Sequence, residues 1–124
     1  MLFSNLKKPY FIAEISANHN GSIQRAKKLI KLAAKSGADA VKFQTYSPDT
    51  MTIKSDRKEF QITKGLWKGY TLWDLYNKAQ TPYSWHNKLF NYSKKEKILC
   101  FSSPFDDTAV DLLDSLNCPF YKVC

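Results

Sequence analysis

Four short apolar runs, separated by stretches with helical periodicity, most constrain how this chain of 124 residues can fold. The runs cover residues 10–15, 40–45, 98–101 and 120–123. They are almost continuously apolar, which is typical of parallel strands that are covered on both faces. Because helical patterns lie between the runs, the sequence predicts an α/β fold with a parallel sheet.

The predicted helices have recognisable ends. The first begins after Ser22, a suitable N-cap, and stops at Gly37. The second starts at Thr81, with the threonine as its cap and a proline in the first turn. The third follows Asp106. Residues 47–80 form a longer polar connection, in which the apolar pattern predicts one short helix.

Two architectures are possible for such a sheet, namely an open doubly wound sheet and a (β/α)8 TIM barrel. A barrel typically needs about 250 residues. The chain reaches only into a fourth strand, so in a barrel it would supply the N-terminal portion, about four βα units.

Each predicted strand carries a polar or charged residue near its C-terminal end. These residues are Glu14, Lys42, Gln44, Ser103 and Lys122. Buried charge is costly unless it is paired or meets a ligand, and parallel sheets bind ligands at this edge. Two lysines favour an anionic ligand such as a phosphate or carboxylate, with Ser103 as a hydrogen-bond donor. A simple buried ion pair between Glu14 and Lys42 is the alternative interpretation.

The loop after the first strand contains Asn18, His19 and Asn20, which we expect on the rim of this site. A lone loop histidine is more often a hydrogen-bonded surface residue than a metal ligand, and no partner stands at metal-binding spacing. His86 is interpreted as a packing or surface residue. The chain has no Gly-x-Gly-x-x-Gly or Walker motif, which argues against a dinucleotide or P-loop site.

The net charge of +8 comes mainly from lysines spread along the chain. Without an arginine-rich stripe, solvated helix faces are favoured over a nucleic-acid-binding surface. The three cysteines form no Cys-x-x-Cys pair, and no apolar run has the length of a signal peptide or a membrane span. We therefore expect a soluble, cytoplasmic protein with free thiols and no nucleic-acid or membrane partner.

Four motifs resemble, in order and spacing, the N-terminal part of the sialic acid synthases. They are "FIAEISANHNGS", "AKSGADAVKFQTY", "CFSSPFDDTAVDLL" and "CPFYKV". The stretch from residue 65 to residue 95 is more similar to the pseudaminic acid synthase branch than to the N-acetylneuraminate branch. The resemblance covers nearly the whole chain.

The resemblance implies an enzyme that condenses phosphoenolpyruvate with the open-chain aldehyde of an N-acetylated amino sugar and releases phosphate. It also implies a (β/α)8 barrel, a small antifreeze-like C-terminal domain, a homodimer, and a divalent metal, Mn or Mg. The family's metal-binding histidines and its C-terminal domain are not found in residues 1–124. We therefore expect a partial barrel domain, the product of a truncated gene, that is inactive alone.

The resemblance also implies roles for individual residues. Lys42 and Lys122 would hold the carboxylate and phosphate of phosphoenolpyruvate, and Ser103 would add a hydrogen bond to the same ligand. Gln44 would contact the sugar. Glu14 would lie near the reacting carbons as a proton-transfer or water-orienting group, and no metal ligand is assigned in this chain.

One departure from the family pattern is Lys97, where the resemblance leads us to expect a glycine, so this turn is predicted to be strained.

Two other functions stay open. The chain could be a non-catalytic fragment that folds only with a separately encoded remainder. It could also be a small basic polyanion-binding domain, whose affinity for nucleic acid would fall steeply with salt.

Overall fold

The computed structural model describes residues 3–124 and contains a parallel sheet of three strands. The strands are β1 (Ile12–Glu14), β2 (Ala40–Thr45) and β3 (Leu99–Pro104), with β2 in the centre. Both pairings are parallel, and the register sets Glu14 beside Lys42. The predicted α/β architecture is thus confirmed, with β3 beginning one residue later and ending three residues beyond the predicted run.

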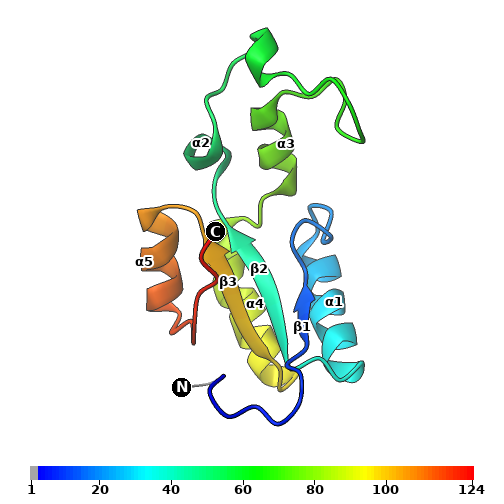
Figure 1. Cartoon of the computed structure of the whole chain (residues 1–124), viewed down its shortest axis with the longest axis vertical. Coiled ribbons are helices and arrows are strands. Elements are labelled where there is room, and N and C mark those ends of the chain that lie inside the picture. Colours follow the sequence, from blue (N-terminus) through cyan, green and yellow to red (C-terminus); the bar gives the residue numbers. More distant parts are fainter. Residues whose placement is uncertain (1–2) are drawn as a thin grey trace.

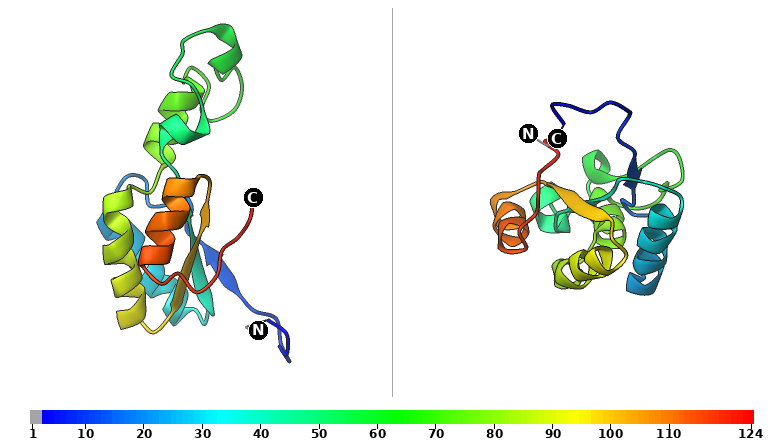
Figure 2. Two further views of the ribbon diagram at one scale, coloured as in Figure 1. Left: turned by 90° about the vertical axis from the view of Figure 1, so that its left-hand side faces the viewer. Right: turned by 90° about the horizontal axis from the view of Figure 1, so that it is seen from below.

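Three helices cover one face of the sheet, namely α1 (Ile23–Lys35), α4 (Tyr83–Lys95) and α5 (Asp107–Ser115) (Figures 1 and 2). Within residues 3–124, no helix covers the other face, which the two terminal segments cross instead (Figure 2). The prediction of strands covered on both faces is confirmed for β3, whose central four residues are all buried. It is wrong for β1 and β2, which leave residues of the second face exposed or half-buried, among them Lys42 and Gln44.

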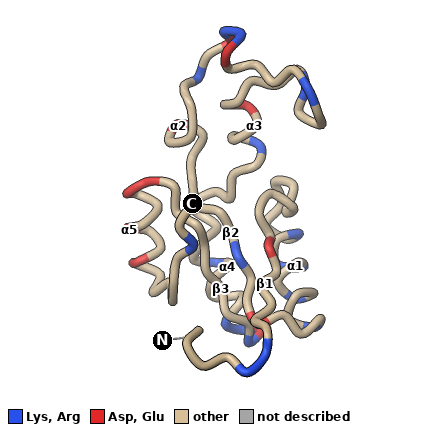
Figure 3. Tube along the Cα trace, viewed as in Figure 1, with Lys and Arg blue, Asp and Glu red and all other residues tan. Residues whose placement is uncertain are grey.

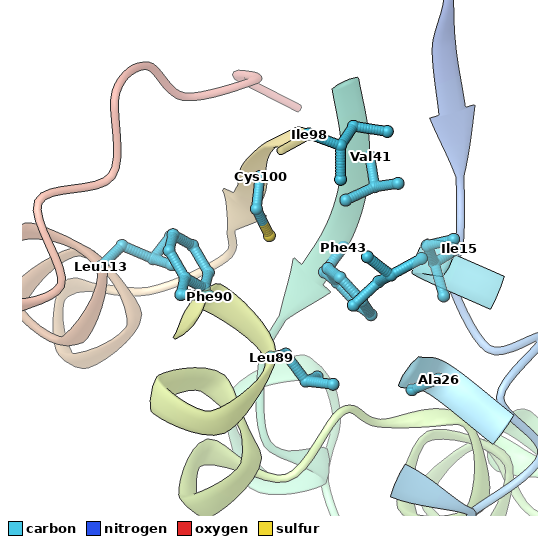
Figure 4. Close-up of a cluster of buried hydrophobic side chains, with 10 residues drawn as sticks. Ile15, Ala26, Val41, Phe43, Leu89, Phe90, Ile98, Cys100 and Leu113 are labelled. Carbon is cyan, nitrogen blue, oxygen red and sulfur yellow. The ribbon is translucent and has the colours of Figure 1, made fainter. Parts of the chain in front are cut away.

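The hydrophobic core lies between the sheet and these helices (Figure 4). Val41 and Phe43 alternate along β2 with the polar residues and point toward the helices, where they are fully buried. Burial of this apolar surface is the main force that holds the helices on the sheet. The buried partners from the other elements include Ile15, Ile30, Leu89, Phe90, Cys100 and Leu113.

The sequence identified the ends of two helices correctly. The Ser22 hydroxyl accepts a hydrogen bond from the backbone N–H three residues on (3.2 Å), and Gly37 has φ +82° just after α1. Asp106 caps α5 in the same manner, at 2.8 Å. These caps satisfy N–H groups that a helix leaves without intrahelical partners.

Thr81 does not cap α4, so that prediction is wrong. The residue before the helix is Pro82, which has no side-chain hydrogen bond to offer. The Thr81 hydroxyl instead lies 3.2 Å from Nε2 of His19, a residue 62 positions earlier in the chain. A contact between such distant residues leaves no local pattern in the sequence.

Residues 47–80, called the lobe from here on, project beyond the C-terminal ends of the strands (Figures 1 and 2). The lobe contains α2 (Pro48–Met51), the short 3-10 helix η1 (Lys58–Phe60) and α3 (Leu72–Ala79). The sequence predicted α3 and missed the other two, which are too short for a periodic pattern. Tyr46 packs edge-on against Tyr76 of α3 (5.7 Å between ring centroids) and joins the lobe to the sheet.

The predicted fourth strand is not formed, which is a correction to the count of about four βα units. Tyr121 makes a single parallel bridge to Ser102, and the backbone N–H of Lys122 donates to the carbonyl of Ser102 (3.3 Å). Pro119 has no N–H to donate, and in the described residues the segment pairs with no strand other than β3. The structure therefore holds three βα units and one bridge. None of the helices in residues 3–124 is long and apolar enough to span a membrane.

The turn between α4 and β3 confirms the strain expected at Lys97, because this residue adopts φ +57°. The N–H of Lys97 donates to the carbonyl of Lys94 (3.1 Å), and that of Ile98 donates to Ser93 (3.1 Å). Such helix ends favour glycine, since a side chain in the left-handed region costs about 1–2 kcal/mol.

We predict that Lys97→Gly raises the free energy of unfolding by up to about 1 kcal/mol, because relief of the left-handed strain exceeds the added freedom of the unfolded chain. Urea denaturation followed by tryptophan fluorescence measures the change. The matched control is Lys95→Gly, in the last turn of α4, which should lower stability by about 0.5–1 kcal/mol. Equal destabilisation by both variants would contradict a strained turn.

Candidate functional site

Four of the predicted site residues lie together on the helix-free face, near the C-terminal ends of the strands. The register pairs Glu14 with Lys42 and Gln44 with Ser103, and paired residues of a parallel sheet share a face. The Lys42 ammonium forms an ion pair with the Glu14 carboxylate. The lysine side chain is 15% exposed and the glutamate side chain 42% exposed, so the pair is open to solvent on the carboxylate side. Pairs this exposed add only about 0–1 kcal/mol to stability.

The Gln44 side chain is held by the loop that follows β1. Its Oε1 accepts a hydrogen bond from the hydroxyl of Ser16 (3.1 Å), which leaves the N–H groups of the carboxamide available as donors. Ser16 adopts φ +46°, a conformation that non-glycine residues rarely take and that is often found at functional sites.

The two consecutive serines of β3 have opposite surroundings. Ser102 points toward the helices, and its hydroxyl lies 2.6 Å from that of Thr45. Ser103 is fully buried on the other face, and its Oγ has no hydrogen-bond partner in residues 3–124. A buried polar atom without a partner costs about 1–3 kcal/mol and is a rare feature of folded proteins. A ligand on this face would satisfy it.

Lys122 is the predicted site residue that the structure does not bring to the others. Its backbone lies beside β3, one position after the Tyr121–Ser102 bridge, so it faces the same side as Ser103. Its side chain is exposed, however, and the ammonium lies 3.5 Å from Sγ of Cys124. No contact in the described part of the chain joins it to Lys42 or Ser103.

The loop of residues 16–21, called the rim loop from here on, follows β1. Asn18 and Asn20 are exposed, as expected for the rim of a site. His19 is fully buried, which corrects its predicted surface position. Its Nδ1 accepts the N–H of Gly21 (3.1 Å), so in the neutral ring Nε2 carries the proton and donates to Thr81. The histidine therefore anchors the rim loop instead of meeting a ligand.

His86 confirms its interpretation as a packing residue. Its Nδ1–H donates to the carbonyl of Pro82 (3.1 Å), so Nε2 accepts a hydrogen bond from the hydroxyl of Thr45 (2.8 Å). Thr45 in turn accepts from Ser102. This chain of hydrogen bonds satisfies the hydroxyls that β2 and β3 direct into the space beneath the helices. Burial lowers the pKa of His86 and of His19 from the ordinary value for histidine.

A divalent metal does not fit the residues that this part of the protein brings together. Residues 3–124 hold no group of three histidine, cysteine or carboxylate side chains that could bind a metal ion. Glu14 is paired with a lysine, whose positive charge would repel a cation. The Mn or Mg implied by the resemblance therefore stays a prediction, and no chemical step is assigned to it.

A comparison of the sequence with models of protein families identifies the family of this chain. Residues 29–124 match the NeuB family. The chain belongs to the NeuB family. This match covers β2, β3 and the helices around them, which carry Lys42, Gln44, Ser103 and Lys122.

Pairwise comparison also finds proteins that are similar to this chain. The chain is 49% identical to a pseudaminic acid synthase of Campylobacter jejuni over 98% of its own length, and 47% identical to that of Helicobacter pylori over 95%. It is 32% identical to human N-acetylneuraminate-9-phosphate synthase over 92% of its length. It spans only about a third of each of these relatives (35%, 35% and 32%).

Solved structures confirm the predicted fold. The N-acetylneuraminic acid synthetase of Leptospira borgpetersenii, in complex with citrate, matches 99% of this chain at a TM-score of 0.77 and 26% identity. A spore coat polysaccharide biosynthesis protein of Bacillus subtilis matches 95% at 0.66 and 30% identity. The chain covers 40% and 30% of these proteins. Residues 3–124 of this chain thus have the α/β fold of the N-terminal part of a TIM barrel.

We predict that Ser103→Ala leaves the free energy of unfolding unchanged or raises it by up to about 1 kcal/mol, because it removes a buried hydroxyl without a partner. Ser102→Ala is the matched control and should cost about 1–3 kcal/mol, because it deprives Thr45 of a hydrogen bond. Urea denaturation of the two variants tests the difference. A similar loss of stability in both would show that Ser103 is not an unsatisfied group.

The buried histidines predict a pH dependence of stability. Their folded pKa values lie below the ordinary value of 6.5, so the unfolded state binds more protons. Their contribution is fully present above pH 6.5 and is lost as the pH falls through the folded pKa. Each histidine lowers the free energy of unfolding by at most about 1.4 kcal/mol per pH unit. Urea denaturation between pH 7.5 and 5.0, with imidazole NMR titration, measures the effect, and constant stability over this range would contradict it.

Proposed function

We propose that this chain supplies the phosphoenolpyruvate-binding part of a pseudaminic acid synthase. In the proposed reaction, phosphoenolpyruvate condenses with the aldehyde of an N-acetylated amino sugar and inorganic phosphate is released. The observation that carries the proposal is the cluster of Glu14, Lys42, Gln44 and Ser103 on the helix-free face, with a buried hydroxyl that lacks a partner. The 49% identity to a pseudaminic acid synthase supports the choice of branch.

The charges of the site suit a ligand with a carboxylate and a phosphate. Lys42 is the cation of the cluster, and in the ligand-free protein its charge is balanced by Glu14. A bound anion would share this ammonium and accept the hydrogen bond of Ser103. Lys122 would join as a second cation if its exposed side chain turned toward Ser103, since its backbone already lies at the right register.

The two remaining residues suit the other substrate and the reacting atoms. The Glu14 carboxylate is an acceptor open to solvent, so it could orient a water molecule or take up a proton next to the ligand. Within residues 3–124 only Oε1 of the Gln44 carboxamide is bonded, so its N–H groups could donate to a sugar hydroxyl. The homodimer and the divalent metal implied by the resemblance belong to the same proposal.

The structure also favours the idea that this chain works together with further βα units. β1 pairs only with β2, so its outer edge is open in residues 3–124. Phe11 beside it is 63% exposed, and a groove with a volume of about 600 Å³ runs along β1 and α1. An open apolar edge of this kind is covered in functional parallel sheets. Lysines and arginines are dispersed over the lobe and the helices instead of forming one stripe (Figure 3), which does not favour a polyanion-binding domain.

We predict that Lys42→Ala weakens the binding of phosphoenolpyruvate by at least about tenfold, because a charge-assisted hydrogen bond is worth about 1.5–3 kcal/mol. Isothermal titration calorimetry measures the affinity. Lys31→Ala, an exposed lysine of α1, is the matched control and should bind as the parent does. Ser103→Ala should weaken binding without loss of stability. Unchanged binding in both Lys42→Ala and Lys122→Ala would overturn the site assignment.

A further inference from the structure

A second cavity lies between the rim loop and the lobe, outside the cluster at the strand ends. It has a volume of about 590 Å³, within the range of sites for small molecules. One wall is the rim loop, which contributes Asn20. The other wall is formed by Trp67 and by Asn77 and Lys78 in the last turn of α3. Trp67, Asn77 and Lys78 take no part in the site proposed above, whereas Asn20 lies on its rim.

The two walls are fixed relative to each other before any ligand binds. The rim loop contains successive tight turns, in which Asn18 donates to the carbonyl of Ile15 (2.9 Å) and Asn20 to that of Ala17 (3.0 Å). The buried His19 ties this loop to Thr81, which follows the end of α3. Asn20 itself has φ +48°, a strained conformation that the rest of the loop maintains.

The walls combine one cation with an aromatic surface and carboxamide donors. The ammonium of Lys78 donates to the Tyr70 hydroxyl (2.7 Å) and lies 4.4 Å from the centroid of its ring, so it is held beside that ring. Trp67 packs edge-on against the same tyrosine (5.5 Å) and presents an aromatic surface. Oδ1 of Asn77 accepts from Gln80 (3.1 Å), which leaves its N–H groups as donors.

An aromatic surface flanked by carboxamide groups suits a sugar that carries an acetamido group. The apolar ring face or the acetyl methyl group can pack on Trp67, while Asn20 and Asn77 can bond to the amide and the hydroxyls. The rim loop also links the cavity to the first site, because Ala17 lines the cavity and the preceding Ser16 holds Gln44.

We propose that this cavity is a specificity subsite that holds an N-acetyl group of the amino sugar. The inference rests on the proposed function, since it concerns the second substrate of the same reaction. Trp67 would be the residue that selects acetylated over non-acetylated sugars, and the rim loop would link this selection to Gln44 at the strand ends.

The test uses N-acetyl-D-glucosamine as the probe and D-glucose as its non-acetylated comparison, with binding to the chain measured by saturation-transfer NMR titration. We expect the acetyl methyl signal to receive the strongest saturation and the acetylated sugar to bind at least about tenfold more tightly. Trp67→Ala should lower this affinity by about tenfold or more, whereas Trp67→Phe should keep most of it. Trp73→Ala is the matched control, because this tryptophan also lies in the lobe but does not line the cavity.

Absent binding, equal binding of the two sugars, or equal losses in Trp67→Ala and Trp73→Ala would each overturn the subsite. Displacement of the sugar by inorganic phosphate would overturn it as well, since it would indicate an anion site at Lys78. Phosphoenolpyruvate titration separates this proposal from the function on which it rests. Trp67→Ala should leave phosphoenolpyruvate binding unchanged. If the chain does not bind phosphoenolpyruvate but still binds the acetylated sugar through Trp67, the subsite is supported and the proposed function is not.

Discussion

The core and the candidate site both depend on the register of one central strand, β2. Val41 and Phe43 point toward the helices and are fully buried, while Lys42 and Gln44 point to the opposite face. Because side chains alternate with a period of two, a slip of one residue would place the lysine among the apolar side chains. The cost of burying that charge therefore enforces the register that also assembles the site.

Side chains of β2 and β3 alternate between the two faces of the sheet. This alternation explains why the consecutive residues Ser102 and Ser103 differ in hydrogen bonding. Ser102 belongs to the helix face, where Thr45 and His86 complete a chain of buried hydrogen bonds. Ser103 belongs to the other face and has no partner within residues 3–124. The protein thus satisfies the polar groups that support its core and leaves one unsatisfied where a ligand is proposed to bind.

Local patterns in the sequence were sufficient for the strands β1 to β3, the cap of Ser22, the start of a helix after Asp106, and the side of the sheet on which the polar residues gather. They were insufficient wherever a contact joins distant residues. The burial of His19 depends on Thr81, and the missing fourth strand depends on how many neighbours residues 120–123 have. Lys97 is intermediate, since only the comparison with a family pattern, and no local propensity, indicated its strained turn.

The helix-free face carries aromatic side chains beside its charged ones, because the register sets Phe101 next to Lys42. Phe101 packs against Phe120 (4.1 Å between ring centroids), which in turn contacts Phe3 of the N-terminal segment (5.1 Å). Gln44 and Ser103 follow at the upper end, beside the rim loop and the lobe. A ligand that entered from the C-terminal ends of the strands would therefore meet Gln44 and Ser103 first and Lys42 two residues deeper along β2.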